Sequence, residues 1–472
     1  MNTPDTGNNW RRFPAWSVWG RGLVLVFALV FPFCTGPSEY DSNLVKYWGL
    51  MVFAGVAAIL LLGQFKSDNE CGGMAALWKP ALIAVCIGIY MTLCAGVRLD
   101  TVVTAVILAA VGAVCVGRRQ SAAPLPRRTL LPLILLFIVF LICSLASSDQ
   151  YTALFGQNYR KTGFVTFSSC MMVLVATVYF LKRREDVRLC LRLLLAASPI
   201  ICVIGLAQYF GVNFPAGPSV EAPDLLRSFG TMGQANWFGT YLMLLLPFAV
   251  TEFLQGRRIF GALASCLIYA NVLTSLTRGV WLTAILFLIV ALMTLKRERG
   301  KLFQLVGLFV VVTAMLSPWD DWRLFRRAAT LQQEVTAAAD GSPGTGSGRF
   351  AFWKYGLSKL PQHALIGAGP DNYASIASPN DKAPNTKAHS IYVEYALTLG
   401  LPGLACYLWL LLKSFSKLGG ELNAWAFRCS LMAYLVQGIT LHDTIHAWPL
   451  VWLIAGLALV WSRESPDKQR GL

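Results

Sequence analysis

A histidine close to a tyrosine and a glutamate, at His389, Tyr392 and Glu394, is the clearest candidate for proton chemistry in this sequence. Imidazole titrates nearer to neutral pH than any other side chain, so it can take a proton from an attacking hydroxyl. A histidine at the start of a helix also serves as a cap or an interface residue. The residues alone leave both interpretations of His389 open, a general base or a structural residue at the start of a helix.

Two arginines stand where an anion could bind. Arg278 interrupts a stretch that is otherwise apolar from Ile259 to Leu295, and a charge at membrane depth is costly and usually functional. Snorkelling to lipid headgroups or capping of the preceding helix would explain it as well. Arg227 lies ahead of a segment rich in Gly, Gln and Asn that ends at Asn236, which suits a phosphate, although an ion pair with Asp224 is the simpler alternative.

The remaining histidines favour a structural interpretation. His442 and His446 flank Asp443 at a spacing that a metal ion could use. The apolar runs on both sides leave room for only a short connection, so we interpret these residues as a polar turn and predict no metal site. His363 lies beside Pro361 with no obvious partner, and we interpret it as structural.

Long apolar runs must position these residues. Hydrophobic residues make up 56% of the 472 positions and charged residues only 14%, whereas a soluble domain has about 25% charged residues. Runs of roughly 17–25 apolar residues cross a bilayer as helices. The sequence therefore predicts an all-α, polytopic membrane protein with about 12–14 transmembrane helices. The candidate spans are 17–35, 46–64, 79–97, 101–117, 129–147, 163–181, 189–210, 235–254, 259–276, 279–295, 302–318, 391–413, 424–440 and 447–462.

The basic residues indicate how the chain is oriented. If the spans alternate in direction and the N-terminus is cytoplasmic, every basic cluster between spans falls on the cytoplasmic side, as does the C-terminal tail. The net charge of +16 is then explained by topology and by attraction to anionic membrane lipids, so we expect no nucleic-acid partner. We divide the chain into N-terminal spans (1–150), core spans with the arginines (151–318), one long extracytoplasmic loop (319–389), and C-terminal spans with a cytoplasmic tail (390–472).

Four segments, in this order, carry a resemblance to a known family. They read RSFGTMGQANWFGTYLMLLLPF from Arg227, SLTRGVWL around Arg278, GRFAFWKYGLSKLPQHALIGAGPDNYA around Arg349, and KAHSIYVEYALTLGLPGL around His389. Together they resemble the O-antigen ligase and polymerase superfamily of bacterial membrane glycosyltransferases, over roughly residues 150 to 415. The chain departs from the family pattern in having more predicted spans than is usual, and in Ser390, which stands where an asparagine is frequent.

The resemblance implies a GT-C-like helical fold and a defined reaction. Such enzymes transfer a glycan from an undecaprenyl-diphosphate carrier to an acceptor on the outer face of the bacterial cytoplasmic membrane, with inversion and without metal or other cofactor. By position, Arg227 and Arg278 would hold the diphosphate and His389 would activate the acceptor hydroxyl. The resemblance leaves ligase, polymerase and protein O-oligosaccharyltransferase open, and the acceptor could be a lipid, a glycan or a protein. Secondary site candidates are Arg160, Arg349, Asn236 and Tyr392.

A transporter or flippase of a lipid-linked saccharide is the alternative. It would also need many spans and outward arginines. Transporters, however, place charges or broken helices near the bilayer midplane and often contain a sequence repeat. The polar candidates here gather on one predicted face, which favours chemistry at the outer leaflet.

Overall fold

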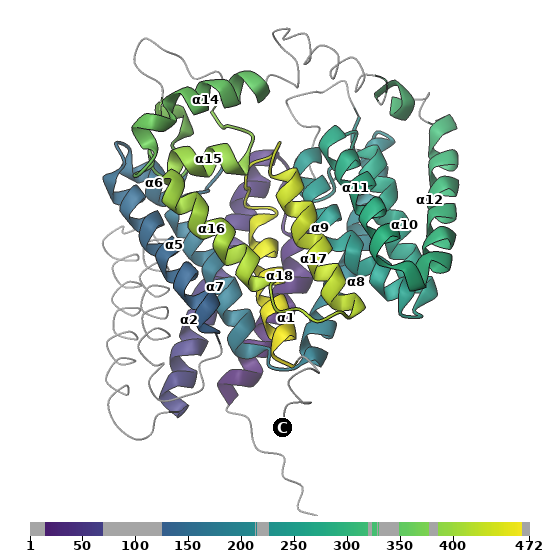
Figure 1. Ribbon diagram of the computed structural model, residues 1–472, viewed down its shortest axis with the longest axis horizontal. Helices are drawn as coiled ribbons and strands as arrows, with labels where there is room; N and C mark the ends of the chain where they lie inside the picture. Colours follow the sequence, from purple (N-terminus) through teal and green to yellow (C-terminus); the bar gives the residue numbers. More distant parts are fainter. Residues whose placement is uncertain are drawn as a thin grey trace, which may run out of the picture.

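The computed structural model describes residues 15–68, 125–212, 214, 226–319, 323–327, 329, 349–376 and 386–464. Within these ranges every regular element is helical and no strand occurs, so the predicted all-α fold is confirmed (Figure 1). In this part of the chain, six helices are long and apolar enough to cross a membrane: Trp16–Phe33, Tyr40–Gly63, Arg127–Ala146, Arg184–Tyr209, Ala235–Leu254 and Lys296–Pro318. The protein is therefore a multi-pass membrane protein.

A helix satisfies all of its internal backbone groups, which is why long apolar runs take this form in a bilayer. The α-helices are α1 (Ala15–Val30), α2 (Glu39–Asp68), α5 (Arg127–Ala146), α6 (Gln150–Phe155), α7 (Phe164–Phe180), α8 (Arg184–Tyr209), α9 (Ala235–Leu254), α10 (Arg258–Thr274), α11 (Arg278–Thr294), α12 (Arg299–Trp319), α14 (Arg349–His363), α15 (Ile391–Thr398), α16 (Gly400–Ser414), α17 (Leu422–Gln437) and α18 (Trp448–Trp461). Short 3-10 turns at Phe31–Phe33, Lys296–Glu298, Tyr373–Ile376 and Ser462–Glu464 complete the described elements.

The predicted spans agree with these helices except at one place. Spans 79–97 and 101–117 lie outside the described residues. The single span predicted for 391–413 is wrong, because the structure breaks it into α15 and α16. Figure 1 shows α15 close to α14 at one end of the bundle, whereas α16 runs down into it.

The break between α15 and α16 is built by two glycines. Gly400 has a φ of +73°, a conformation that costs other residues energy. A Cβ on Gly367 would stand 2.1 Å from the carbonyl carbon of Thr398, so the segment before residue 370 passes directly against the break. Three backbone hydrogen bonds join this segment to the break: Ala368 N to Leu397 O (2.9 Å), Gly369 N to Thr398 O (3.0 Å) and Leu401 N to Ala364 O (2.8 Å).

The buried centre of the bundle consists of α7, α9 and α18. Every residue of α18 is buried, and so is the whole apolar stretch of α9. Phe140 of α5 stacks on Phe167 of α7 at 3.6 Å between ring centroids, and Trp452 of α18 packs edge-on against the same ring at 5.6 Å. In contrast, α12 lies at the margin in Figure 1 and is mostly exposed, as expected for a helix that faces lipid.

Ion pairs mark one end of the bundle, which we call the basic end. Arg184 at the start of α8 bonds to Glu421 ahead of α17 (2.8 Å) and to the carbonyl of Trp461 at the end of α18 (3.3 Å). Glu252 at the end of α9 forms ion pairs with Arg192 (3.6 Å) and with Arg257 (3.4 Å). The ends of α8, α9, α17 and α18 that carry these basic clusters therefore meet on one side, as the charge pattern predicts.

Candidate functional site

Four arginines line a pocket at the other end of the bundle. Arg227, Arg278, Arg327 and Arg349 come from the segment before α9, the start of α11, the helical turn at 323–327 and the start of α14. The space they enclose is about 760 Å³, open solvent at its mouth included. We call it the arginine pocket. Its other lining residues are Asn236, Leu276, Thr277, Gly279, Val280, Gln437, Thr440 and Leu441.

Neutral acceptors are among the partners that hold Arg227. Its Nε donates to the carbonyl of Ser275 (2.8 Å) and its Nη2 to the hydroxyl of Thr277 (2.7 Å). Asn236 Oδ1 accepts from Thr277 (3.2 Å) and lies 3.5 Å from Arg227 Nη2. Asn236 thus orients two of the pocket's polar groups. Asp224, the alternative partner for Arg227, lies outside the described residues.

A glutamine holds the loop that carries Arg227. Gln208 near the end of α8 accepts from the backbone N–H groups of Phe229 (3.1 Å) and Gly230 (2.7 Å) and donates to the carbonyl of Gly230 (2.8 Å). Gly230 has a φ of +56°, so this tight turn needs glycine. The loop is therefore ordered before any ligand arrives.

The pocket has the charge expected of an anion site. Arg278 and Arg349 are the first residues of α11 and α14, where the unsatisfied N–H groups of a helix add positive potential. The described lining residues include no aspartate or glutamate. Guanidinium groups donate paired hydrogen bonds to phosphate oxygens, so the arrangement suits a ligand with several anionic oxygens.

His389 lies next to this pocket in an unusual backbone conformation. Its φ is +49°, which is uncommon for a residue other than glycine. Its ring is 5.0 Å from that of His442 and 5.8 Å from Phe352 of α14, and its Nδ1 is buried without a hydrogen-bond partner. Burial, and then the positive charges of Arg349, Arg160 and Lys387, lower the pKa of His389 to about 4. The imidazole is therefore neutral at neutral pH and able to accept a proton.

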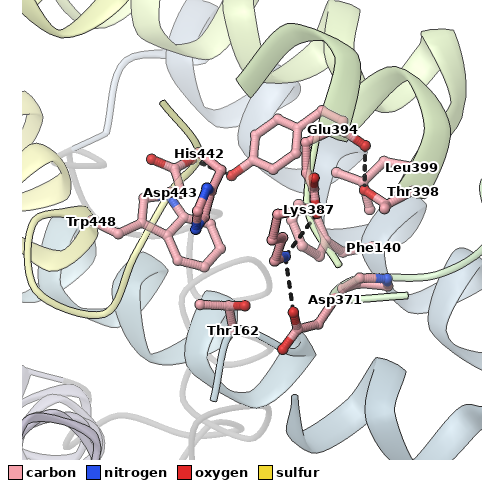
Figure 2. A pocket seen from close by; sticks show the side chains of 12 residues that line it. Phe140, Thr162, Asp371, Lys387, Glu394, Thr398, Leu399, His442, Asp443 and Trp448 are labelled. Atoms are coloured by element: carbon pink, nitrogen blue, oxygen red, sulfur yellow. Dashed lines mark hydrogen bonds and ion pairs between the residues drawn. The ribbon is translucent and has the colours of Figure 1, made fainter. Parts of the chain in front are cut away.

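Three buried charged residues come from the chain before and after His389. We call Asp371, Lys387 and Glu394 the acid–lysine cluster. Lys387 Nζ is 2.8 Å from Asp371 Oδ1 and 2.7 Å from Glu394 Oε1, and all three residues are almost completely buried (Figure 2). Burial alone would raise the pKa of Asp371, but Lys387 and Arg160 outweigh it and the pKa lies below its ordinary value. Burial would lower the pKa of Lys387, yet Asp371 and Glu394 raise it.

One short connection, between α17 and α18, reaches both regions. Its Thr440 and Leu441 line the arginine pocket, while His442 and Asp443 line the space beside the acid–lysine cluster (Figure 2). The carboxylate of Asp443 accepts hydrogen bonds from three hydroxyls, those of Tyr395, Tyr407 and Tyr434. Burial raises the pKa of Asp443 to about 6, although these hydrogen bonds favour its charged form. The tyrosines thereby fix the connection that presents His442 to His389.

His442 and His446, which the sequence pattern favours as a polar turn, lie in the connection between α17 and α18. His446 stacks on Trp237 at 4.7 Å and is completely buried, whereas His442 packs against His389. In the described ranges no group of three or more His, Cys, Asp and Glu side chains could hold a metal ion.

The secondary candidates separate into different places. Asn236 and Arg349 line the arginine pocket, as Arg227 and Arg278 do. Arg160 instead lies 3.8 Å from Asp371 and bonds to the carbonyl of Thr386 (3.2 Å), so it belongs beside the acid–lysine cluster. Tyr392 donates its hydroxyl to the carbonyl of Leu435 (2.7 Å) and borders an apolar groove on α17; it is not among the residues that line the arginine pocket.

Several residues of the site were not singled out from the sequence. Arg327 lies within the run before Glu334 whose sequence favours an ordinary helix, and nothing in its spacing indicates a ligand. Asp371 and Lys387 lie far apart in the sequence, on either side of the 3-10 turn at Tyr373–Ile376 and the chain that follows it, so no local pattern could reveal them. For His442, the available signal is its place beside Asp443 in a short connection between two apolar runs. From the sequence alone, that pattern favours a structural turn.

Comparison with known proteins identifies part of the chain. Residues 262–408 match the family model described as O-antigen ligase. The match includes α11, α12, α14 and α15, with Arg278, Arg349 and His389, and it confirms the predicted resemblance for this segment; Arg227 and Asn236 precede it. None of the curated proteins compared with the chain matches it.

Proposed function

We propose, from the O-antigen ligase domain at residues 262–408, that this multi-pass membrane protein is an inverting, metal-independent glycosyltransferase. It moves a glycan from an undecaprenyl-diphosphate carrier to an acceptor at the outer face of a bacterial cytoplasmic membrane. The observation that carries the proposal is the position of one neutral imidazole, His389, beside a pocket lined by four arginines. A leaving diphosphate and an attacking hydroxyl need these two kinds of group.

The arginine pocket would bind the diphosphate of the donor. Breaking the bond between the anomeric carbon and the diphosphate oxygen leaves negative charge on the phosphate. Arg227 is held ready by Ser275 and Thr277, and fixed guanidinium groups stabilise such developing charge without first having to reorganise. Arg278 and Arg349, at the starts of α11 and α14, would also stabilise the negative charge on the phosphate.

His389 would act as the general base. The acceptor hydroxyl gives its proton to the imidazole while its oxygen attacks the anomeric carbon from the face opposite the diphosphate. The glycosidic bond forms as the bond to the diphosphate breaks, so the anomeric centre inverts and undecaprenyl diphosphate leaves. A pKa near 4 makes a weak base, because the best bases titrate near the working pH.

Binding of the donor would raise the pKa of His389 and so make it a stronger base. Arg349 is the charge that most lowers the pKa of His389 after burial, and it also lines the arginine pocket. A diphosphate bound there brings negative charge next to the same guanidinium and offsets it. The pKa of His389 therefore rises when the donor is bound, and the base gains strength when it is needed.

Transport of a lipid-linked saccharide is the second candidate. A transporter would require the pocket to be reachable from both ends of the bundle. The candidate site residues lie at the end of the bundle opposite the basic end, where ion pairs such as Arg184 with Glu421 join the helices instead. This one-sided arrangement supports transfer at a single membrane face.

The deciding experiment uses full-length protein in nanodiscs with an undecaprenyl-diphosphate oligosaccharide, a pool of acceptors and EDTA. We expect release of undecaprenyl diphosphate that requires an acceptor and is lost in His389→Ala. The glycosylated product, identified by mass spectrometry, would distinguish ligase from polymerase. Tight donor binding with no release in any acceptor pool, together with donor movement across proteoliposomes, would contradict the proposal and support the transporter.

A further inference from the structure

The backbone of His389 is held in a conformation that it would not adopt unaided. A positive φ at a non-glycine residue costs energy and persists where the surroundings enforce it. Trp353 of α14 donates its indole N–H to the carbonyl of Ala388 (3.1 Å), directly before the histidine. On the other side, Ile391 N donates to the carbonyl of Gly438 (2.8 Å). The turn is therefore anchored to α14 and to the end of α17.

Glu394 supplies the strongest contacts to this turn. Its Oε2 accepts from the backbone N–H of Ala388 (2.9 Å), and its Oε1 accepts from Lys387 Nζ (2.7 Å). One carboxylate, five residues after His389, thus binds the two residues that precede the histidine. The chain must fold back on itself to allow this, and His389 lies at the bend.

The cluster also connects the bend to the loops around it. Lys387 bridges Glu394 to Asp371, and Asp371 accepts from the backbone N–H of Gln157 (2.8 Å). The turn that carries Asp371 is fastened to the end of α5, because Asn372 donates to Ser147 Oγ (2.8 Å). Displacing Glu394 would therefore loosen the turn that carries His389 relative to the loops that carry Asp371 and Gln157.

Resting on the proposed function, we propose that Glu394 is a positioning residue for His389, acting through Lys387 and the N–H of Ala388. It contacts neither donor nor acceptor. It aims the imidazole, and it keeps the ammonium of Lys387 close to the ring. The arginine pocket binds the donor independently of it, because Glu394 does not line that pocket.

Kinetics provide the first test. In Glu394→Gln one oxygen remains and the charge is lost, so Lys387 and Ala388 cannot both be bound as before. We expect kcat to fall at least tenfold while the KM for the undecaprenyl-diphosphate donor stays within twofold. Glu421→Gln, which removes a carboxylate from the ion pair with Arg184 at the basic end, is the matched control and should leave both constants unchanged.

A spectroscopic test does not depend on turnover. The chain contains only four histidines, so protein labelled with ¹⁵N-histidine gives few imidazole signals, and His389→Gln identifies the one of interest. We expect Glu394→Gln to shift the His389 signals while the His363 signals stay in place. Lys387→Met should raise the pKa of His389, because Lys387 is one of the charges that lower it.

The outcomes separate this inference from the proposed function. If the unmodified protein transfers glycan and Glu394→Gln keeps both its kcat and its His389 signals, the positioning role is wrong. If the unmodified protein transfers nothing but Glu394→Gln still moves the His389 signals, the positioning role stands and the assigned reaction fails. A loss of kcat that follows only from a lower thermal midpoint, with unaltered His389 signals in the folded fraction, would also overturn the inference.

Discussion

The arginine pocket and the acid–lysine cluster both lie next to His389, but they differ in the signs of the charges they bring together. The described lining of the first contains guanidinium groups and no carboxylate, and Arg227 there bonds to a carbonyl and to a hydroxyl oxygen. In the second, each buried charge faces an opposite one within 3.8 Å. The first arrangement is suited to a charge that arrives and leaves with the ligand. The second is complete in itself and suits a permanent structural role.

Removing the group between the two regions should have the largest effect. His389→Ala should lower kcat by roughly 10²- to 10⁴-fold, the usual contribution of a general base. Donor binding should stay within about twofold, because the arginines remain. Single-turnover release of undecaprenyl diphosphate, alongside equilibrium binding of a fluorescent donor, separates these quantities. Equal losses of binding and turnover would mean that His389 helps to hold the donor.

Breaking the acid–lysine cluster should affect stability. Asp371→Ala leaves Lys387 with one carboxylate instead of two and Arg160 without its acidic neighbour. Breaking a buried ion pair costs about 3–5 kcal/mol, so the free energy of unfolding should fall by about that amount. Chemical denaturation in detergent micelles measures it. Glu298→Ala, which removes the more exposed pair with Lys301 (2.8 Å), should cost less than about 1 kcal/mol.

Breaking the arginine pocket should affect binding instead. Arg278→Ala removes a charge-assisted contact worth about 1.5–3 kcal/mol, which is roughly a 10- to 150-fold increase in donor Kd. Arg257→Ala at the basic end is the matched control, since it removes an arginine of the same chain that pairs with Glu252. If both variants bound the donor equally well, the diphosphate would lie elsewhere.

The pH dependence offers a finer comparison. His389 must be neutral to take a proton, so kcat/KM should be constant above its pKa of about 4 and fall as the pH drops through that value. Arg349→Gln removes a charge that lowers this pKa, and the acid limb of kcat/KM should therefore move to higher pH. In the unmodified protein the acid limb of kcat should also lie at higher pH than that of kcat/KM, because the bound diphosphate offsets Arg349. Coincident limbs would argue against contact between the donor and this arginine.

The membrane class and the long apolar helices could be predicted from the sequence, and three of the arginines that line the pocket were among the candidates, since apolar length and isolated charges are local signals. It did not indicate which polar residues would meet. Arg160 and Arg349 were predicted together, yet they lie in different regions because the contacts of Asp371 with Arg160 and Lys387 join distant parts of the chain. The α15–α16 break was missed as well, because Gly400 and Pro402 are tolerated within membrane helices.

That break has a consequence for building chimeras. Gly367 and Gly400 form one joint, with the two stretches of backbone hydrogen-bonded to each other and no space for a side chain at the closest approach. A segment exchanged between related enzymes to alter glycan choice, if cut at residue 390, would take one half of the joint from each parent. Cutting before 349 and after 414 keeps the halves together and leaves the remaining helices to accept the graft.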